Sequence, residues 1–564
     1  MNQSSRLARR VAGRILLSTL ASALLCVGAV SPARADEYQR ISGEGSSWAA
    51  NAIDAVRVNV RQFGITMDFN PSGSTSGRKN FLNGTVDFAA SDIPFQFKPE
   101  DGSAPEKPVA GSYAYMPVVA GGTAFMYNLK INGKRVTNLR LSGENVAKIF
   151  TRAITKWNDP AIQADNPGLT LPAREVVPVV RSDGSGSSAQ FTKWMIATNK
   201  AIWDDYCQRS GRAPACGYTS FYPTVKGVVA QSGDLGIAGY VSQSFAEGAI
   251  GYVNYSYALG AQFPVAKVLN KAGFYTEPTP ENVAVSLLKA KINENAADPA
   301  VYLTQQLEGV YADADPRSYQ LSSYSYFILP TTIAGQFNEA KGRTLGAVAY
   351  YMMCQAQQQS ASLGYSPMPI NLVQASLKQI GKIPGVQVQN IDIKKCNNPT
   401  FSPDGTNLLA KKALKPKACD KKGPLQCATG TGGLRNVPTE VNSSASGGDG
   451  STSGSGSTSP GSDVSGASGA DGAGSGNDVS GASGADGAGS GSDATETPGG
   501  TPSSGDDAST AGTAANAPVG DVVTTTLKRQ RAGLGLGVVV ALLLVALIVV
   551  PAVLWRRLSG RSAS

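Results

Sequence analysis

Three short segments rich in glycine and serine each precede a predicted helix, and this arrangement can bind an anion. The segments are Gly43–Trp48 (GEGSSW), Ser72–Gly77 (SGSTSG) and Arg181–Ser188 (RSDGSGSS). Glycine lets the backbone approach a ligand closely, and the free N–H groups of a helix N-terminus attract negative charge. Serine hydroxyls add donors, and Arg181 adds a cation. A single such segment is most simply a helix cap or a turn, but the three together predict a site for a small anion.

An aspartate beside these segments indicates which anion fits. Asp92 lies in the sequence Ala90–Pro94 (ASDIP). A carboxylate accepts a hydrogen bond from protonated phosphate, but it repels fully ionised sulfate. The alternative is an ordinary turn aspartate before a proline. We therefore expect a protonated oxyanion as the ligand.

Strands and helices that could position these segments alternate along the chain. The pattern predicts strands at 65–69, 86–90 and 175–181 and helices at 49–63 and 189–199. This alternation is typical of layered α/β folds. Open α/β folds bind ligands outside the carboxyl ends of their strands, where these segments are expected.

The composition excludes several kinds of chemistry. The chain has 564 residues and no histidine, which excludes Ser-His and Cys-His nucleophiles and histidine metal sites. The net charge is +9, and the predicted body, residues 36–437, also carries +9 because the charges of the remaining segments cancel. The body has no basic cluster flanked by aromatic residues, so the sequence predicts no nucleic-acid binding. A lysine-rich run at 411–422 is either a solvated surface loop or a contact for an anionic polymer or lipid headgroup.

Both ends of the chain have the composition of targeting or tethering segments. Residues 1–35 combine a basic start, an apolar stretch and an Ala-x-Ala site, which predicts a signal peptide. Residues 438–525 are mostly small and polar and predict a disordered linker. Its duplication at 463–492 is read as a spacer, with calcium binding as the weaker alternative. The uncharged run Leu534–Leu554 is about 31 Å long as a helix, so it predicts a membrane span. With an exported N-terminus, residues 555–564 become a cytoplasmic tail.

Six cysteines remain after removal of the predicted signal peptide. An even number in an exported chain favours disulfides. Closeness in sequence favours Cys207–Cys216 and Cys419–Cys427, which leaves Cys354 and Cys396, although fifteen pairings are formally possible. A zinc site with four cysteine ligands is the alternative.

The body resembles the periplasmic phosphate-binding proteins (PstS-like) of the Pst-type ABC phosphate importers. The resemblance spans roughly residues 40–380. It is carried, in order, by the strings GEGSSWA (43–49), SGSTSG (72–77), NGTVDFAASDIP (83–94), ITKWNDPAI (154–162), NPGLTLP (166–172), VVRSDGSGSSAQFT (179–192), GAIGYVNYSYA (248–258) and SSYSYFILP (322–330).

The resemblance implies a fold, a ligand and a partner. The fold is the type II periplasmic-binding-protein fold, in which the chain crosses twice between two lobes. Residues 36–118 and 265–400 are expected in lobe I and residues 119–264 in lobe II, with 401–437 as an added extension. Inorganic phosphate is expected between the lobes, with the permease subunits of an ABC importer as partner and no cofactor, metal or catalytic residue.

The resemblance also implies a set of ligand-binding residues. Asp183 is expected to pair with the arginine and hold it in place. Two positions depart from the commonest pattern: a serine replaces a threonine at 47, and a tryptophan replaces a phenylalanine at 48, which the site tolerates if the contact is the backbone N–H. The expected phosphate-binding residues are Ser47, Trp48, Ser74, Asp92, Arg181, Ser185, Gly186 and Ser187.

Two other functions fit parts of the sequence. Ser76–Lys79 matches the Ser-x-x-Lys motif of acyl-enzymes, but the accompanying Lys-Thr-Gly motif is missing, so we expect no enzyme. A surface adhesin or wall-associated protein suits the long linker and anchor as well as a transport protein does. Another oxyanion is a further alternative ligand, and arsenate cannot be separated from phosphate on the sequence.

Overall fold

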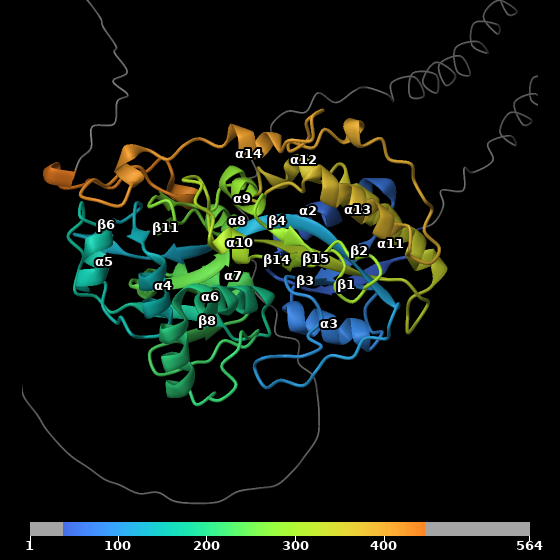
Figure 1. The fold of residues 1–564 in the computed structure, drawn as a ribbon, viewed down its shortest axis with the longest axis horizontal. Helices are drawn as coiled ribbons and strands as arrows, with labels where there is room; N and C mark the ends of the chain where they lie inside the picture. Colours follow the sequence, from blue (N-terminus) through green and yellow to red (C-terminus); the bar gives the residue numbers. More distant parts are fainter. Residues whose placement is uncertain (1–37, 446–564) are drawn as a thin grey trace, which may run out of the picture. The chain divides into compact units, whose positions relative to one another are not determined.

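The computed structural model describes residues 38–445, and Figure 1 shows their arrangement. The predicted signal peptide (1–35), most of the predicted linker, the predicted membrane span (534–554) and the predicted tail (555–564) lie outside the described residues. Among residues 38–445, no helix is long and apolar enough to cross a membrane.

One long strand, β4 (Tyr113–Tyr127), joins two groups of strands. On one side the order is β2–β1–β3–β15–β4, and on the other it is β4–β10–β8–β9. The first residues of β4 pair antiparallel with β15, and its last five pair antiparallel with β10. All fifteen residues of β4 are buried, as expected for a strand covered on both faces. The partner strands are β1 (Ile41–Gly45), β2 (Met67–Asn70), β3 (Phe88–Ser91), β8 (Val177–Arg181), β9 (Val229–Gln231), β10 (Ala249–Asn254) and β15 (Ser322–Pro330).

The group with β1 is lobe I, the group with β8 is lobe II, and β4 is the first crossover between them. β11 (Val265–Leu269) pairs with β4 near Met126 and with β7 (Arg140–Leu141), so it belongs to lobe II. β12 (Tyr275–Thr276) in turn pairs with β11. The boundary at residue 265 predicted from the sequence is therefore too early, because the chain returns to lobe I only after β12.

Four helices begin directly after parallel strands. In lobe I, α2 (Ala50–Val60) follows β1 and α3 (Ser74–Leu82) follows β2. In lobe II, α6 (Gly186–Arg209) follows β8 and α7 (Gly233–Val241) follows β9. Because β1, β2 and β3 run parallel, as do β8, β9 and β10, each pair of helices starts at the carboxyl edge of its strands. The remaining helices are α4 (Gly143–Phe150), α5 (Pro160–Asp165), α8 (Tyr255–Gly260), α9 (Pro280–Leu287), α10 (Glu308–Tyr311), α11 (Glu339–Met353), α12 (Gln357–Ser360), α13 (Ile370–Ile380) and α14 (Leu408–Lys412).

The predicted helices and strands agree with the structure to within a few residues, except at α6. The sequence predicts its end at Asn199, whereas the helix continues to Arg209. Asn199 has non-helical backbone angles (φ −143°, ψ 44°), so two helical segments meet there. The predicted end coincides with this kink.

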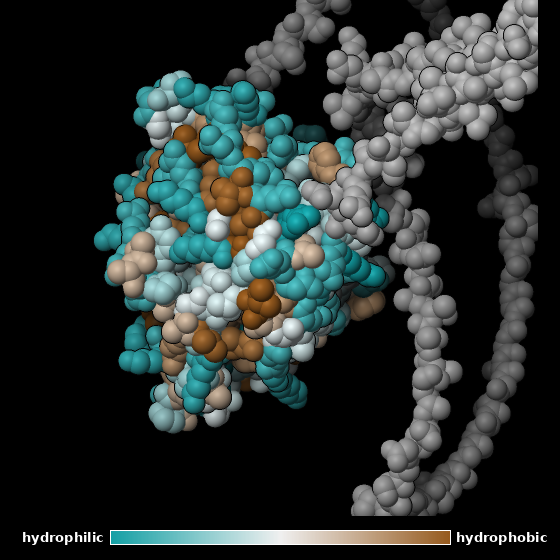
Figure 2. All heavy atoms as spheres, turned by 90° about the vertical axis from the view of Figure 1, so that its right-hand side faces the viewer, coloured by the Kyte–Doolittle hydropathy of each residue, from teal (hydrophilic) through white to brown (hydrophobic). Residues whose placement is uncertain are grey.

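The core consists of apolar side chains between the sheets and their helices. In α2, Ile53, Val56 and Val60 recur at helical spacing and are almost fully buried. The surface of lobe I in Figure 2 is mostly hydrophilic, with small hydrophobic patches between polar residues. Burial of the apolar side chains of the core is the main term that stabilises the fold.

All six cysteines among the described residues form disulfides. The pairs are Cys207–Cys216, Cys354–Cys396 and Cys419–Cys427, as the sequence favours. In the part of the chain that the structure describes, no cluster of three or more His, Cys, Asp or Glu residues could hold a metal ion. The alternative of a four-cysteine zinc site is therefore wrong.

Residues 408–445, here called the strap, cross from lobe I to lobe II (Figure 1, orange). At its start, Leu409 packs against α9 in lobe I. Further along, the Arg140 Nη1 of lobe II donates to the carbonyls of Cys419 (3.0 Å) and Leu425 (2.8 Å). The Asn442 N–H donates to the Gly168 carbonyl at 2.9 Å. Residues 438–445 therefore belong to the folded body, and the predicted linker begins too early.

Candidate functional site

The four helix N-termini of the two lobes meet at one place. The Ser47 Oγ, just before α2, donates to the Asp234 Oδ2 at the start of α7 at 2.6 Å. The Thr75 N–H, in the first turn of α3, donates to the Gly184 carbonyl before α6 at 2.9 Å. Each of these bonds joins lobe I to lobe II, so the structure has the lobes closed on one another. The three glycine- and serine-rich segments predicted to form one site do come together.

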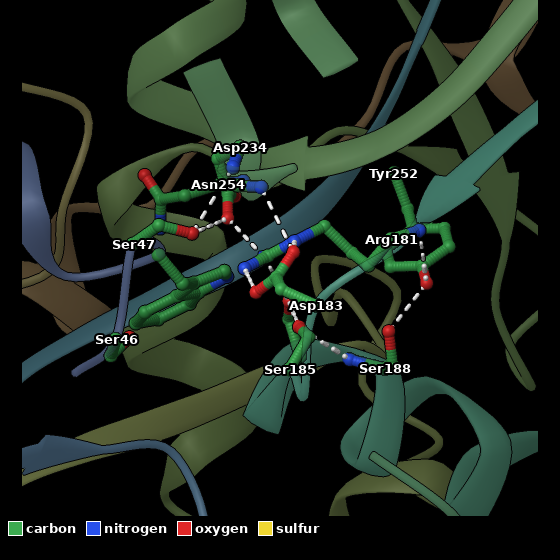
Figure 3. Close-up of polar contacts among 12 residues, drawn as sticks. Ser46, Ser47, Arg181, Asp183, Ser185, Ser188, Asp234, Tyr252 and Asn254 are labelled. Atoms are coloured by element: carbon green, nitrogen blue, oxygen red, sulfur yellow. Dashed lines mark hydrogen bonds and ion pairs between the residues drawn. The ribbon is translucent and has the colours of Figure 1, made fainter. Parts of the chain in front are cut away.

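Arg181, at the end of β8, forms hydrogen bonds with all three nitrogens of its guanidinium group inside the site (Figure 3). Its Nε donates to the Asp183 Oδ1 at 2.8 Å, and its Nη2 donates to the other oxygen of the same carboxylate. Its Nη1 donates to the Asp234 Oδ2 at 2.5 Å and to the Ser187 Oγ at 3.2 Å. Burial alone would lower the pKa of Arg181, but Asp234 and Asp183 raise it above the ordinary value. The guanidinium is therefore charged at any physiological pH and rigidly held.

The expected pairing of Asp183 with Arg181 is present in the structure. Asp183 also accepts the Gly233 N–H at 2.9 Å, which ties the arginine to the start of α7. Its side chain is 12% exposed, whereas that of Arg181 is 1% exposed. Asp183 therefore holds the arginine from the outer side of the site.

Asp234 is a site residue that the sequence prediction missed. Its side chain is completely buried and lies among the labelled groups in Figure 3. Besides Ser47 and Arg181, it accepts the Asn254 N–H at 2.7 Å. The signal that could have revealed it is Ser232–Asp234, which repeats the serine–glycine pattern before a helix. Burial raises the pKa of Asp234, and the charge of Arg181 opposes the rise.

Asp92 lies at the end of β3, on the opposite wall of the site. Its Oδ1 accepts the Ser46 hydroxyl at 2.6 Å, and its Oδ2 accepts the Ser74 hydroxyl at 3.1 Å. Its carbonyl accepts the Gln190 Nε2 of lobe II at 2.9 Å. Burial raises the pKa of Asp92, and the hydrogen bond from Ser46 opposes this rise.

Three predicted residues lie at the N-terminus of α6, where Ser185 is the cap and Gly186 and Ser187 begin the helix. Ser185 caps the helix by accepting the Ser188 N–H at 3.1 Å, and the Ser185 and Ser187 hydroxyls are 2.8 Å apart. Gly186 lies so close to lobe I that a Cβ there would be 2.5 Å from the Ser74 Oγ. A side chain at this position cannot fit between the closed lobes.

The Trp48 side chain points away from the polar groups. Its Nε1 donates to the Thr123 Oγ1 at 3.2 Å, and its ring meets the Tyr365 ring edge-on at 6.0 Å. The residue is 1% exposed. Only its backbone is left to face a ligand, which agrees with the expectation that the substitution of phenylalanine by tryptophan is tolerated.

A groove between the lobes lies beside the site. It has a volume of about 620 Å³ and is lined by Thr75, Arg78 and Glu106 of lobe I and by Tyr218, Ser220 and Phe221 of lobe II, among others. Arg78 is buried and donates to both oxygens of Glu106 at 2.9 and 3.0 Å. Thr75 belongs both to the groove and to the interlobe bond with Gly184, so the groove borders the site.

Comparisons with known proteins agree with this architecture. Residues 30–356 match the family described as PBP superfamily domain. "Phosphate-binding protein PstS 2" of Mycobacterium tuberculosis is 39% identical over 170 residues, which are 29% of this chain and 44% of that protein. The chain thus matches less than half the length of this relative. "Phosphate-binding protein PstS 3" of Mycobacterium leprae is 29% identical over 339 residues, which are 58% of this chain and 83% of that protein.

Among solved structures, a periplasmic phosphate-binding protein (PfluDING) bound with phosphate is similar, with 15% identity and a TM-score of 0.47. The similarity covers 63% of this chain and all of that one. The matched family, together with the two lobes and the two crossovers, confirms the predicted type II periplasmic-binding-protein α/β fold. The chain belongs to the PBP superfamily and is similar to the PstS phosphate-binding proteins.

Proposed function

We propose that this protein captures inorganic phosphate between its two lobes on the extracytoplasmic side of the membrane and delivers it to an ABC importer. The observation that carries the proposal is the meeting of Arg181, the serine hydroxyls and Asp92 at four buried helix N-termini. The relatives named PstS are phosphate-binding proteins, which supports the same ligand. Membership of this family also favours uptake over adhesion, and it supports a role other than catalysis.

The proposed mechanism combines many donors with one acceptor. Hydroxyls of Ser47, Ser74 and Ser187, the amides of the helix N-termini and Arg181 donate to the phosphate oxygens. The eight residues expected from the sequence remain the proposed ligand set, with Asp183 holding the arginine. Asp92 accepts a hydrogen bond from the O–H group that phosphate carries near neutral pH and sulfate lacks. Closure of the lobes removes water, which strengthens each of these bonds.

Calorimetry with phosphate and sulfate on the wild type and Asp92→Asn tests this proposal. The wild type is expected to bind phosphate and to discriminate against sulfate. Asp92→Asn is expected to bind phosphate more weakly, by about 1.5–3 kcal/mol for a charge-assisted bond, and to lose part of the discrimination. Absence of phosphate binding by the wild type refutes the proposed ligand. Equal selectivity of the two proteins refutes the role of Asp92.

The proposed tether is residues 534–554, which lie outside the described residues. We expect the full-length protein to fractionate with membranes and a chain ending at residue 525 to be released. Release of the full-length protein without proteolysis contradicts a C-terminal anchor.

A further inference from the structure

Asp234 adds a second buried carboxylate to the proposed phosphate site, on the side of the arginine that faces the serines. Arg181 has three nitrogens, and Asp183 occupies Nε and Nη2. The remaining Nη1 is shared between Asp234 and Ser187. Asp234 therefore contacts the one guanidinium edge that points to the proposed ligand groups.

The carboxylate oxygen of Asp234 that contacts Arg181 also accepts a hydrogen bond from Ser47 of lobe I, whose hydroxyl is proposed to bind the ligand. The Ser47 Oγ donates to it at 2.6 Å, and the Asp234 N–H donates back to the Ser47 Oγ at 3.1 Å. In the neighbouring residue, the Ser46 Oγ donates to Asp92 at 2.6 Å. The turn before α2 thus lies between two carboxylates, one from each lobe.

The charges around this turn do not balance. Arg181 is one cation, and three carboxylates face it or the turn: Asp92, Asp183 and Asp234. Two other titratable groups interact with the charge of Asp234, and both are phenols that are neutral at physiological pH. They are Tyr257 of α8, whose hydroxyl donates to the Ser47 carbonyl at 2.6 Å, and Tyr365. Burial raises the pKa of both Asp92 and Asp234, as expected for carboxylates without enough positive charge.

A dianion with a single proton can satisfy only one of the two acceptors. HPO₄²⁻ donates a hydrogen bond from its single O–H to one carboxylate and then places an unprotonated oxygen against the other, which costs repulsion in a site without water. H₂PO₄⁻ has one proton for each carboxylate. Binding depends on the total number of protons in the complex. A given proton can therefore reside on the phosphate or on the carboxylate that faces it.

We propose that Asp234 is a specificity-determining residue that accepts a hydrogen bond from a second O–H of the ligand, so that the site selects monobasic phosphate. This inference rests on the proposed function. The negative charge of Asp234 partly neutralises Arg181, so the site attracts an anion less strongly. In compensation, Asp234 accepts a hydrogen bond that only a doubly protonated phosphate can donate while its other O–H binds Asp92.

The test measures the phosphate affinity of the full-length wild type, Asp234→Asn and Asp204→Asn at about pH 6 and about pH 8. Asp204 is the matched control, because it is an acid of the same lobe that pairs with Lys200 on the surface. For the wild type and Asp204→Asn, we expect the affinity to fall about tenfold between the two pH values, since monobasic phosphate is depleted. For Asp234→Asn, we expect little change, because HPO₄²⁻ still satisfies Asp92.

Three outcomes separate the possible failures. Wild-type protein that binds no phosphate at either pH overturns both the proposed function and this inference. Wild-type protein that binds equally well at both pH values overturns this inference alone. An Asp234→Asn protein that loses the same factor in affinity at both pH values shows that Asp234 only positions Arg181, which also overturns it.

A second measurement needs no variant and therefore does not depend on the folding of Asp234→Asn. Calorimetry of the wild type at about pH 8, in two buffers with different ionisation enthalpies, gives the protons taken up on binding. Uptake of about one proton per phosphate is expected, because the ligand in solution is HPO₄²⁻. Zero uptake contradicts the inference.

Discussion

Replacement of Gly186 by alanine should block lobe closure while leaving each lobe intact. The added Cβ would lie 2.5 Å from the Ser74 Oγ, 2.7 Å from the Asp92 Oδ2 and 2.9 Å from the Asp92 Cβ. Carbon atoms in contact are about 3.5 Å apart, so the lobes must separate by about 0.5–1 Å at this point. Ser74 can rotate away, but the Asp92 Cβ is fixed to the backbone. All of the clashing atoms belong to lobe I, whereas Gly186 belongs to lobe II.

The expected loss follows from the interlobe bonds nearest to this clash. Two hydrogen bonds join the lobes here. The Thr75 N–H donates to the Gly184 carbonyl, and the Gln190 Nε2 donates to the Asp92 carbonyl, each at 2.9 Å. A separation of about 1 Å takes both beyond hydrogen-bonding distance. At about 1 kcal/mol for each bond, the closed form loses about 2 kcal/mol, or about 30-fold in phosphate affinity. Weaker contacts between the lobes and the ligand add to this loss.

Calorimetry gives the affinity, and thermal unfolding without phosphate gives the stability of the Gly186→Ala protein. The affinity is expected to fall about 30-fold or more, with an unchanged or slightly lower melting temperature, because an open form relieves the clash. Gly239→Ala in α7 is the matched control, since a Cβ there meets nothing within 4 Å. Wild-type affinity in the Gly186→Ala protein refutes the reasoning that phosphate is held by the closed arrangement described above.

Two further predictions concern stability. Because burial raises the pKa of Asp92 above its unfolded value of about 4, the stability linked to this group is present below that pH and is lost as the pH rises through the folded pKa. The melting temperature of the phosphate-free protein should therefore fall less between about pH 4 and pH 7 in Asp92→Asn than in the wild type; equal slopes would contradict this. The Cys354–Cys396 disulfide joins residues 42 apart, and Cys419–Cys427 joins residues 8 apart. Because a longer loop restricts the unfolded chain more, removal of the first should lower the unfolding free energy by about 4 kcal/mol and removal of the second by about 2.5 kcal/mol. Denaturant unfolding of the two double alanine variants measures both, and a larger loss for the shorter loop is the contrary result.

The sequence predicts much of this site because its signals are local. A strand followed by glycine, serine and a helix places Ser47, Ser74 and Ser185 at strand ends without knowledge of the whole fold. The pairing of Arg181 with Asp183 joins residues only two positions apart. Such features depend on the backbone near the residue itself.

The parts that the sequence did not predict depend on contacts between distant segments. Asp234 reaches Ser47 across 187 positions, and a single acid after Gly233 resembles any helix start. The strap residue Thr439 looks like part of a polar linker, yet the Thr137 N–H donates to its Oγ1 at 2.8 Å. Composition alone predicts no such bond. The placement of β11 in lobe II likewise follows from its pairing with β4 and not from its local sequence.

The continuous strand β4 has a consequence for how the protein unfolds. Because its first part is hydrogen-bonded within lobe I and its last five residues within lobe II, neither sheet can lose this strand without disrupting the other. We therefore expect the two lobes in residues 38–445 to unfold as one cooperative unit, with a single thermal transition. If phosphate binds at the carboxyl ends of the strands as proposed, we expect it to slow amide hydrogen exchange throughout both sheets, including at the edge strand β2.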